Sequence, residues 1–213
     1  MEIRAEKIIL IKESDKRNLI KLAGYFSGLV SVITLFISLF LVMSLNPIYD
    51  FRIHMISLLG IIKGKEFFNT GIILTSILHF SFINSLRIHF KKIKEDSFII
   101  TTAFLFGILF CFSEMGVGIF PANIQFGFIH RKVAFLFFHF SLLMTFLFSI
   151  LLIHHPETKH IAYLGFGSFL LIFLFMYEHG AFLEWIMALG LWSWIGIVSG
   201  YMIYLNYKHK KVE

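Results

Sequence analysis

The sequence predicts an all-α integral membrane protein, a bundle of six transmembrane helices, from its composition, its long apolar runs and the placement of its charges. Hydrophobic residues make up 58% of the 213 residues and charged residues only 15%, whereas a soluble domain carries about a quarter charged residues. A soluble core of this size could not bury so much apolar surface, so we expect the excess to face lipid. The 28 phenylalanines fit such a surface.

Six apolar stretches are long enough to be transmembrane helices, each of which needs about 20 residues to cross the hydrocarbon core. They run over 22–45, 67–86, 98–119, 133–153, 161–177 and 182–204. The fifth stretch is short, and the third contains Glu114 near its end. The run from Gly116 to Pro121 predicts that the third helix ends there, because proline lacks an N–H donor and restricts the residue before it.

Lys and Arg gather in alternate connections between these stretches. Fourteen of the 19 lie in the N-terminal segment, after the second and fourth stretches, and in the C-terminal tail; the other five are Arg52, Lys63, Lys65, Arg131 and Lys132. Cytoplasmic loops are rich in Lys and Arg, so both termini are expected in the cytoplasm. We therefore expect a multi-pass protein of the cell membrane with a cytoplasmic segment at 1–21, a transmembrane domain at 22–206 and a basic cytoplasmic tail at 207–213.

Several function classes are excluded or disfavoured. The net charge of +6 follows from membrane topology, and the basic runs contain no nucleic-acid motif. The chain has a single cysteine, Cys111, which excludes an internal disulfide and a metal cluster held by several thiolates. We expect no cofactor, no metal site and no cleavable signal peptide. The expected partners are membrane lipids, together with either a second copy of the chain or another membrane protein.

The connection over 47–64 is long and far from polar. Its apolar residues recur at helical spacing, which predicts a short amphipathic helix on the outer face, ended by Gly60 and Gly64. A plain interfacial anchor is the alternative. Within the bundle, the pairs Gly24/Gly28 and Gly196/Gly200 predict close helix packing. Trp185 fits an aromatic belt at the outer interface.

Ionisable groups inside a membrane are costly, so each one is a candidate for function. Glu114 shares a helical face with Gly107, Cys111 and Gly118, which predicts that it points into the bundle. His130 begins the fourth helix and could reach the same space, giving an acid–histidine pair. The alternatives are an interfacial Glu114 that pairs with a nearby basic side chain, Arg131 or Lys132, and an interfacial His130.

The remaining polar candidates lie near the same outer end. Ser57, Asn69 and Glu184 complete a candidate ligand site with Glu114 and His130. For Glu184, an electrostatic role at the start of a helix is the alternative. His79 and His139 are expected to be packing or lipid-facing residues.

The chain resembles a known but uncharacterised family. The segment Met55 to Gly60, the pair Phe68-Asn69, and the run Gly118 to Pro121 followed by His130 resemble the family called domain of unknown function 998, which is distantly similar to DRAM and Sfk-type six-helix proteins. The resemblance covers roughly 22–204 and implies six helices and a cluster at the outer face. It implies no activity. The apolar residues at 58–59 depart from the family, whose members often carry a polar residue there.

We expect a binding or structural protein whose outer cavity accepts a lipid or isoprenoid headgroup. A lipid-modifying enzyme that uses Glu114 and His130 as catalytic acid and base is the second hypothesis. A small-molecule transporter or channel is the third, and it is disfavoured because no inverted repeats with broken helices are visible.

Overall fold

The computed structural model describes residues 2–93 and 96–210. Seven helical segments lie in this part of the chain. They are α1 (Glu2–Ser44), the 3-10 helix η1 (Ile56–Gly60), α2 (Lys65–Lys92), α3 (Ser97–Ile119), α4 (Gly127–Ile153), α5 (Lys159–Glu178) and α6 (Ala181–Lys210). Each α-helix contains a stretch of 20 to 29 residues that is long and apolar enough to cross a membrane, since about 20 residues at about 1.5 Å each span the hydrocarbon core. The six predicted transmembrane stretches are confirmed, and no strand occurs in these residues.

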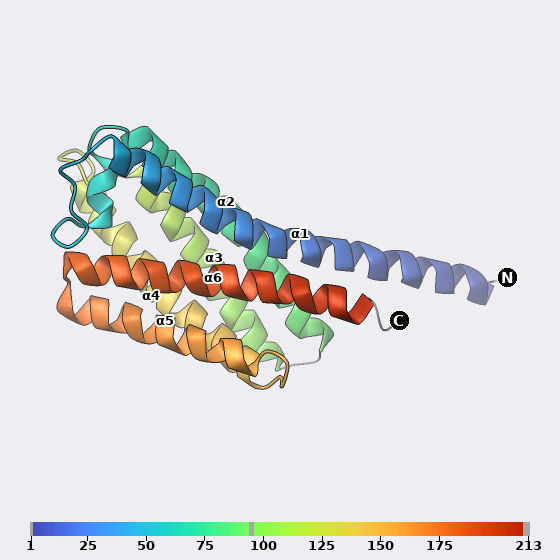
Figure 1. The fold of residues 1–213 in the computed structure, drawn as a ribbon. Coiled ribbons are helices and arrows are strands. Elements are labelled where there is room, and N and C mark those ends of the chain that lie inside the picture. The colour runs from blue at the N-terminus through green and yellow to red at the C-terminus, as the bar shows by residue number, and fades with distance from the viewer. Residues whose placement is uncertain (1, 94–95, 211–213) are drawn as a thin grey trace.

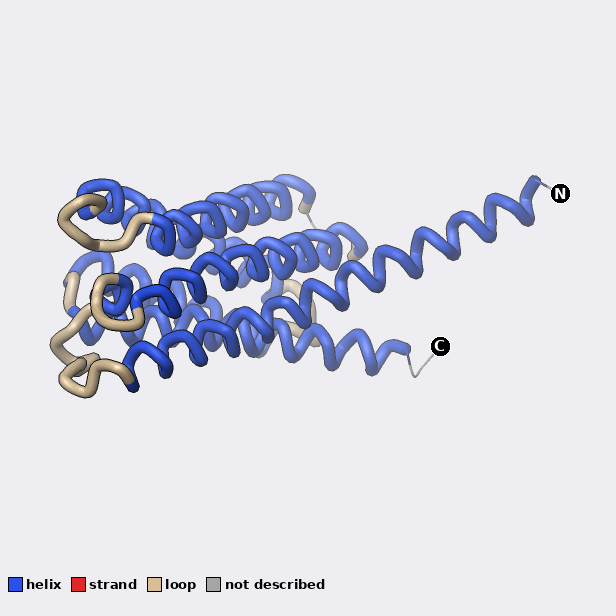
Figure 2. Tube along the Cα trace, turned by 90° about the horizontal axis from the view of Figure 1, so that it is seen from above, coloured by secondary structure: helices blue, strands red, loops and turns tan. Residues whose placement is uncertain are grey.

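The six long helices form a closed bundle. Consecutive helices pack against each other, and α6 returns to contact α1 (Figures 1 and 2). Both chain termini lie at one end of the bundle, which we call the basic end (Figure 1). The α1–α2, α3–α4 and α5–α6 connections lie at the opposite end, which we call the loop end (Figure 2).

Helix α1 is longer than the predicted transmembrane stretch. It begins at Glu2 rather than near residue 22, and its first part extends beyond the bundle (Figure 1). Residues 2–21 contain neither glycine nor proline, so nothing in the sequence interrupts the helix. Within α1, the stretch Lys16–Ser44 is long and apolar enough to cross a membrane.

Phenylalanine occupies both the interior and the outer surface of the bundle. Phe82, Phe110 and Phe148 are fully buried between helices. On the outside, Phe40 and Phe112 are 72% and 63% exposed. An apolar exterior of this kind is stable only against hydrocarbon, as the excess of phenylalanine predicted.

Glycine brings α1 close to α2. A methyl group at Gly24 would collide with the side chain of Ser85 and lie 2.5 Å from the carbonyl oxygen of Ser81. At Gly196, the same methyl group would meet only Val32, at an ordinary 3.7 Å. The predicted close helix packing is therefore found at the pair Gly24/Gly28. At Gly196, the helices are far enough apart to admit a larger residue.

The connection before α2 differs from the predicted amphipathic helix. Only Ile56–Gly60 is helical, as the short η1, and it is the part that is buried against the bundle. Before it, the Asp50 side chain accepts hydrogen bonds from the backbone N–H and the guanidinium of Arg52. Such local side-chain bonds favour turns over helix. Gly64, with φ of 81°, directly precedes α2.

Candidate functional site

The start of α6 holds η1 in place at the loop end. Oε2 of Glu184 accepts a hydrogen bond from the backbone N–H of Ile56 at 2.7 Å, and Glu184 is only 8% exposed. At the other end of η1, Nδ2 of Asn69 donates to the carbonyl oxygen of Gly60 at 3.1 Å. Because η1 is tied to both α6 and α2, Ser57 within it has a defined position.

Trp185 ties the preceding loop to the same helix. Its Nε1–H contacts the Tyr49 hydroxyl at 3.1 Å and the carbonyl oxygen of His54 at 3.2 Å. The Tyr49 hydroxyl in turn donates to the carbonyl oxygen of Met55 at 2.9 Å. Trp185 is 7% exposed, so its indole packs within the protein and fixes the loop; its predicted place in an aromatic belt stays a prediction.

Burial also affects the chemistry of this loop. It raises the pKa of Tyr49 to about 12, and the nearby Glu184 carboxylate adds to the effect, while the hydrogen bond from Trp185 opposes it. On the exposed side, the hydrogen bond from Arg52 lowers the pKa of Asp50 below its ordinary value.

Glu114 forms a buried pair with His79. The Nδ1 atom of His79 lies 2.8 Å from Oε2 of Glu114, and the two side chains are 1% and 3% exposed. Glu114 points into the bundle, as predicted. The alternative in which it lies at the interface beside Arg131 or Lys132 is wrong. His79 does not face lipid: its ring packs against Phe110, as a packing residue would, but it also pairs with the Glu114 carboxyl group, which was not predicted.

His130 has a different partner from the one predicted. Its Nδ1 lies 2.7 Å from the carbonyl oxygen of Phe120, just after the end of α3. Since a carbonyl oxygen only accepts, Nδ1 carries the proton, and in the neutral ring Nε2 is then an acceptor. In the described part of the chain, Glu114 and His130 thus bond to different residues, and no hydrogen bond joins the two side chains.

Four of the five predicted site residues nevertheless line one cavity at the loop end, which we call the loop-end cavity. It has a volume of about 60 Å³, and η1, α2, α3, α4 and α6 enclose it. Its polar lining residues are Ser57, Glu114, His130 and Glu184, and its apolar lining includes Phe68, Val117, Ala134, Phe137, Met187 and Trp192. Asn69 is not part of the lining; its hydrogen bond to the carbonyl oxygen of Gly60 holds the end of η1.

The polar lining is rich in hydrogen-bond acceptors. Two carboxyl groups, Glu114 and Glu184, belong to it, and an ionised carboxylate accepts but cannot donate. Nε2 of a neutral His130 is a third acceptor, and the Ser57 hydroxyl is the one group that can act either way. The chemistry of this lining therefore favours a group that donates hydrogen bonds, such as a hydroxyl or an amine, over a phosphate.

Sequence reasoning missed His79 as a member of this site. A signal was present in the middle of α2, where Thr75, Ser76 and His79 are three polar residues within five positions, and all three are fully buried. A polar stripe of this kind in a membrane helix points toward the bundle interior. The partner helix could not be read from it, because pairing of α2 with α3 is a property of the tertiary fold.

The comparisons with known proteins give one result. A family model described as Protein of unknown function (DUF998) matches residues 29–206. No curated protein and no solved structure matches the chain.

Proposed function

The chain belongs to this DUF998 family of proteins of unknown function, and we propose that it binds the polar end of a membrane lipid or isoprenoid in the loop-end cavity. The observation that carries the proposal is the convergence of Ser57, Glu114, His130 and Glu184, from four separate elements, on one cavity. Polar groups are expensive at this position in a membrane helix bundle. A common ligand would explain why four costly polar side chains lie together here.

The size of the cavity supports a small polar group as the part that enters. A volume of about 60 Å³ has room for about four water molecules. A hydroxyl, an amine or a short ethanolamine unit fits such a space, while the apolar chain of the ligand lies against apolar side chains of the bundle.

The acceptor-rich lining defines the class of ligand further. A hydroxyl or ammonium group satisfies carboxyl oxygens by donation, whereas an ionised carboxylate at Glu114 or Glu184 would repel a phosphate. The bound lipid is therefore a donor lipid, either one with an amine headgroup or an isoprenoid alcohol.

The proposal includes an orientation. With the basic end in the cytoplasm, as the distribution of Lys and Arg favours, the loop-end cavity lies in the outer leaflet of the cell membrane. Single cysteines in a Cys111→Ala background test this orientation, because Lys63 and Lys91 are exposed at opposite ends. A membrane-impermeant maleimide should label Lys63→Cys in intact cells and Lys91→Cys only after permeabilisation. The reverse pattern would contradict the orientation.

Native mass spectrometry of the purified chain tests the ligand. The probes are dioctanoyl phosphatidylethanolamine and its choline counterpart, which has no N–H donor, and the isoprenoid alcohol farnesol with its methyl ether. We expect the amine and the alcohol to bind at least about tenfold more tightly than their matched analogues, since a charge-assisted hydrogen bond is lost. Equal binding of donor and analogue would refute the proposal.

Matched variants locate the binding. Glu114→Gln and Glu184→Gln remove charge while leaving an oxygen that can keep the contacts to His79 and Ile56. Both should weaken binding of the amine probe, whereas Glu66→Gln, an exposed residue at the same end, should not. If all three variants bind alike, the ligand does not occupy this cavity.

A second candidate is acid–base chemistry on a bound lipid. The buried His79 orients Glu114 from behind while the carboxyl group lines the cavity, an arrangement typical of a positioned general acid or base. Incubation with each donor probe, followed by mass analysis, distinguishes the two functions. A new product that Glu114→Gln no longer forms would favour the enzyme, and an unchanged probe favours binding alone.

A further inference from the structure

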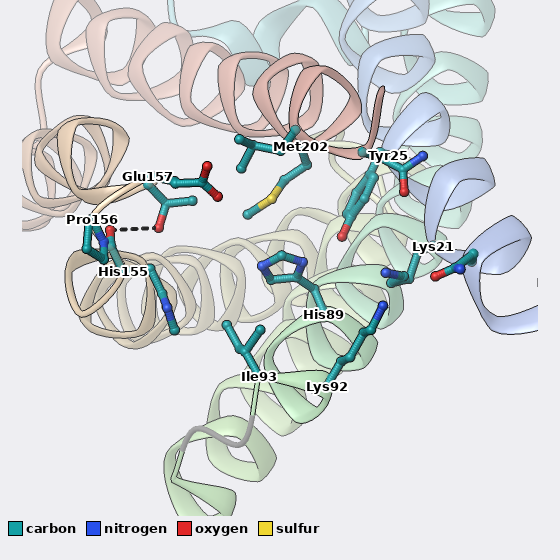
Figure 3. A pocket seen from close by; sticks show the side chains of 13 residues that line it. Lys21, Tyr25, His89, Lys92, Ile93, His155, Pro156, Glu157 and Met202 are labelled. Atoms are coloured by element: carbon teal, nitrogen blue, oxygen red, sulfur yellow. Dashed lines mark hydrogen bonds between the residues drawn. The ribbon is translucent and has the colours of Figure 1, made fainter. Parts of the chain in front are cut away.

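A second and larger cavity lies at the basic end of the bundle, far from the loop-end cavity. Its volume is about 520 Å³, and its walls are α1, the last turns of α2, the α4–α5 connection and α6. Figure 3 shows the side chains that line it. We call it the basic-end pocket.

Two lysines supply positive charge to this pocket. Lys21 comes from α1 and Lys92 from the last turn of α2. Figure 3 shows their side chains pointing toward the same space, and the two charges repel each other. Lys21 is only 6% exposed. Within the described part of the chain, neither lysine forms an ion pair, so no carboxylate of that part compensates these charges.

Polar groups from the same helices surround the lysines. Asn18, Lys21 and Tyr25 lie three and four residues apart, which places them on one face of α1. The Tyr25 hydroxyl is buried and has no hydrogen-bond partner among the described residues. Figure 3 shows this hydroxyl next to Lys21, in the pocket. An unsatisfied buried hydroxyl beside unpaired cations indicates a missing acceptor.

The acidic residue of the pocket is already engaged. Oε1 of Glu157 lies 3.0 Å from Nζ of Lys208, so its charge is compensated locally. Its position in the α4–α5 connection is on the opposite side of the pocket from Lys21 and Lys92 (Figure 3).

We propose that the basic-end pocket binds a phosphate group between Lys21, Lys92 and the Tyr25 hydroxyl. A phosphate supplies the anionic oxygens that two ammonium groups and a hydroxyl can donate to. Basic pockets between transmembrane helices are suited to phospholipid headgroups, and the volume admits a phosphorylated headgroup or a soluble phosphoester. This site is independent of the loop-end cavity, and its ligand has the opposite charge preference.

Binding to the purified full chain in detergent tests this proposal and separates the two sources of phosphate. The probes are dioctanoyl phosphatidic acid, dioctanoylglycerol and inorganic phosphate. We expect phosphatidic acid to bind at least about tenfold more tightly than dioctanoylglycerol, which differs only by lacking the phosphate. If inorganic phosphate displaces phosphatidic acid at equal concentration, the ligand is a soluble phosphate; if it does not, the ligand is a lipid headgroup.

Variants assign the binding to named side chains. Lys21→Gln and Lys92→Gln should each weaken binding of phosphatidic acid about tenfold, and Tyr25→Phe about fivefold, in line with charged and neutral hydrogen bonds. Lys21→Arg keeps the charge and should restore most of the binding. Lys91→Gln is the matched control, because Lys91 is exposed one residue away and does not line the pocket.

Two results would overturn the proposal. One is equal binding of phosphatidic acid and dioctanoylglycerol. The other is a loss of binding in Lys91→Gln as large as that in Lys92→Gln, which would indicate a diffuse surface charge effect. Since Lys92 is exposed, its substitution should not impair folding, so the comparison with Lys91 remains informative.

Discussion

The imidazole of His79 and the carboxyl group of Glu114 lie 2.8 Å apart between α2 and α3, with both side chains almost completely buried. A buried pair of this kind costs desolvation free energy, which its hydrogen bond and Coulomb attraction only partly offset. Its presence in a membrane helix bundle indicates a role besides stability. We infer that the pair holds the Glu114 carboxyl group in place at the loop-end cavity.

Breaking this pair should destabilise the bundle. His79→Ala leaves Glu114 buried without its partner, and we expect a loss of about 3–5 kcal/mol in the free energy of unfolding. His139→Ala is the control, because the hydrogen bond of His139 within the described residues goes to the carbonyl oxygen of Phe135, one turn earlier in α4; we expect a loss of no more than about 1.5 kcal/mol. Thermal unfolding in detergent measures both. Equal melting temperatures for the two variants would contradict the burial of Glu114 against His79.

The contact between Glu184 and η1 should be visible in hydrogen exchange. Glu184→Ala removes the acceptor of the Ile56 N–H, which should cost about 1–3 kcal/mol and speed exchange of that amide. Glu184→Gln retains an oxygen acceptor and should keep the amide protected. Exchange at Ile56 that is equally slow in both variants would show that another group holds η1.

The two glycine positions should respond in opposite directions to alanine. Gly24→Ala forces a methyl group against Ser85 and the carbonyl oxygen of Ser81, which should destabilise the bundle by about 1–3 kcal/mol. Gly196→Ala makes only ordinary van der Waals contact with Val32 and should gain about 0.5–1 kcal/mol from helix propensity. Melting temperatures of both variants provide the check, and a shared direction of change would contradict the assigned packing of α1 on α2.

How far the sequence predicts this fold depends on the range of the interactions involved. The six helices follow from apolar runs and charge placement, which are local properties. Burial of Glu114 follows equally from the small residues on its helical face. In contrast, the partner of Glu114 depends on which helices become neighbours, and composition alone does not reveal that α2 presents His79 to α3.

The loop before α2 illustrates the same limit. Its apolar spacing resembles an amphipathic helix, but the Asp50–Arg52 turn and the bonds from Trp185 to Tyr49 and His54 decide its conformation. Trp185 lies more than a hundred residues from that loop in sequence. A long-range contact of this kind overrides a local periodicity, which is why only η1 remains helical.

The loop should also respond to alkaline pH through Tyr49. Its pKa is raised to about 12 in the folded chain, above the ordinary value of about 10. The folded state therefore holds this proton more tightly than the unfolded state, so the contribution to stability is complete below pH 10 and is lost as the pH rises from about 10 to 12. Ultraviolet difference titration of wild type against Tyr49→Phe isolates this group. A transition near 10 would contradict its burial against Trp185.

A density map of the protein in nanodiscs that contain phosphatidylethanolamine tests most directly whether the loop-end cavity holds a lipid headgroup. Ala134→Leu is the matched variant, because it fills the cavity from its apolar side without altering a polar group. We expect headgroup density within hydrogen-bond distance of Glu114 and Glu184 in the wild type and none in Ala134→Leu. Isolated water peaks in the wild-type cavity, with no continuous density leading to an acyl chain, would contradict a lipid-binding role.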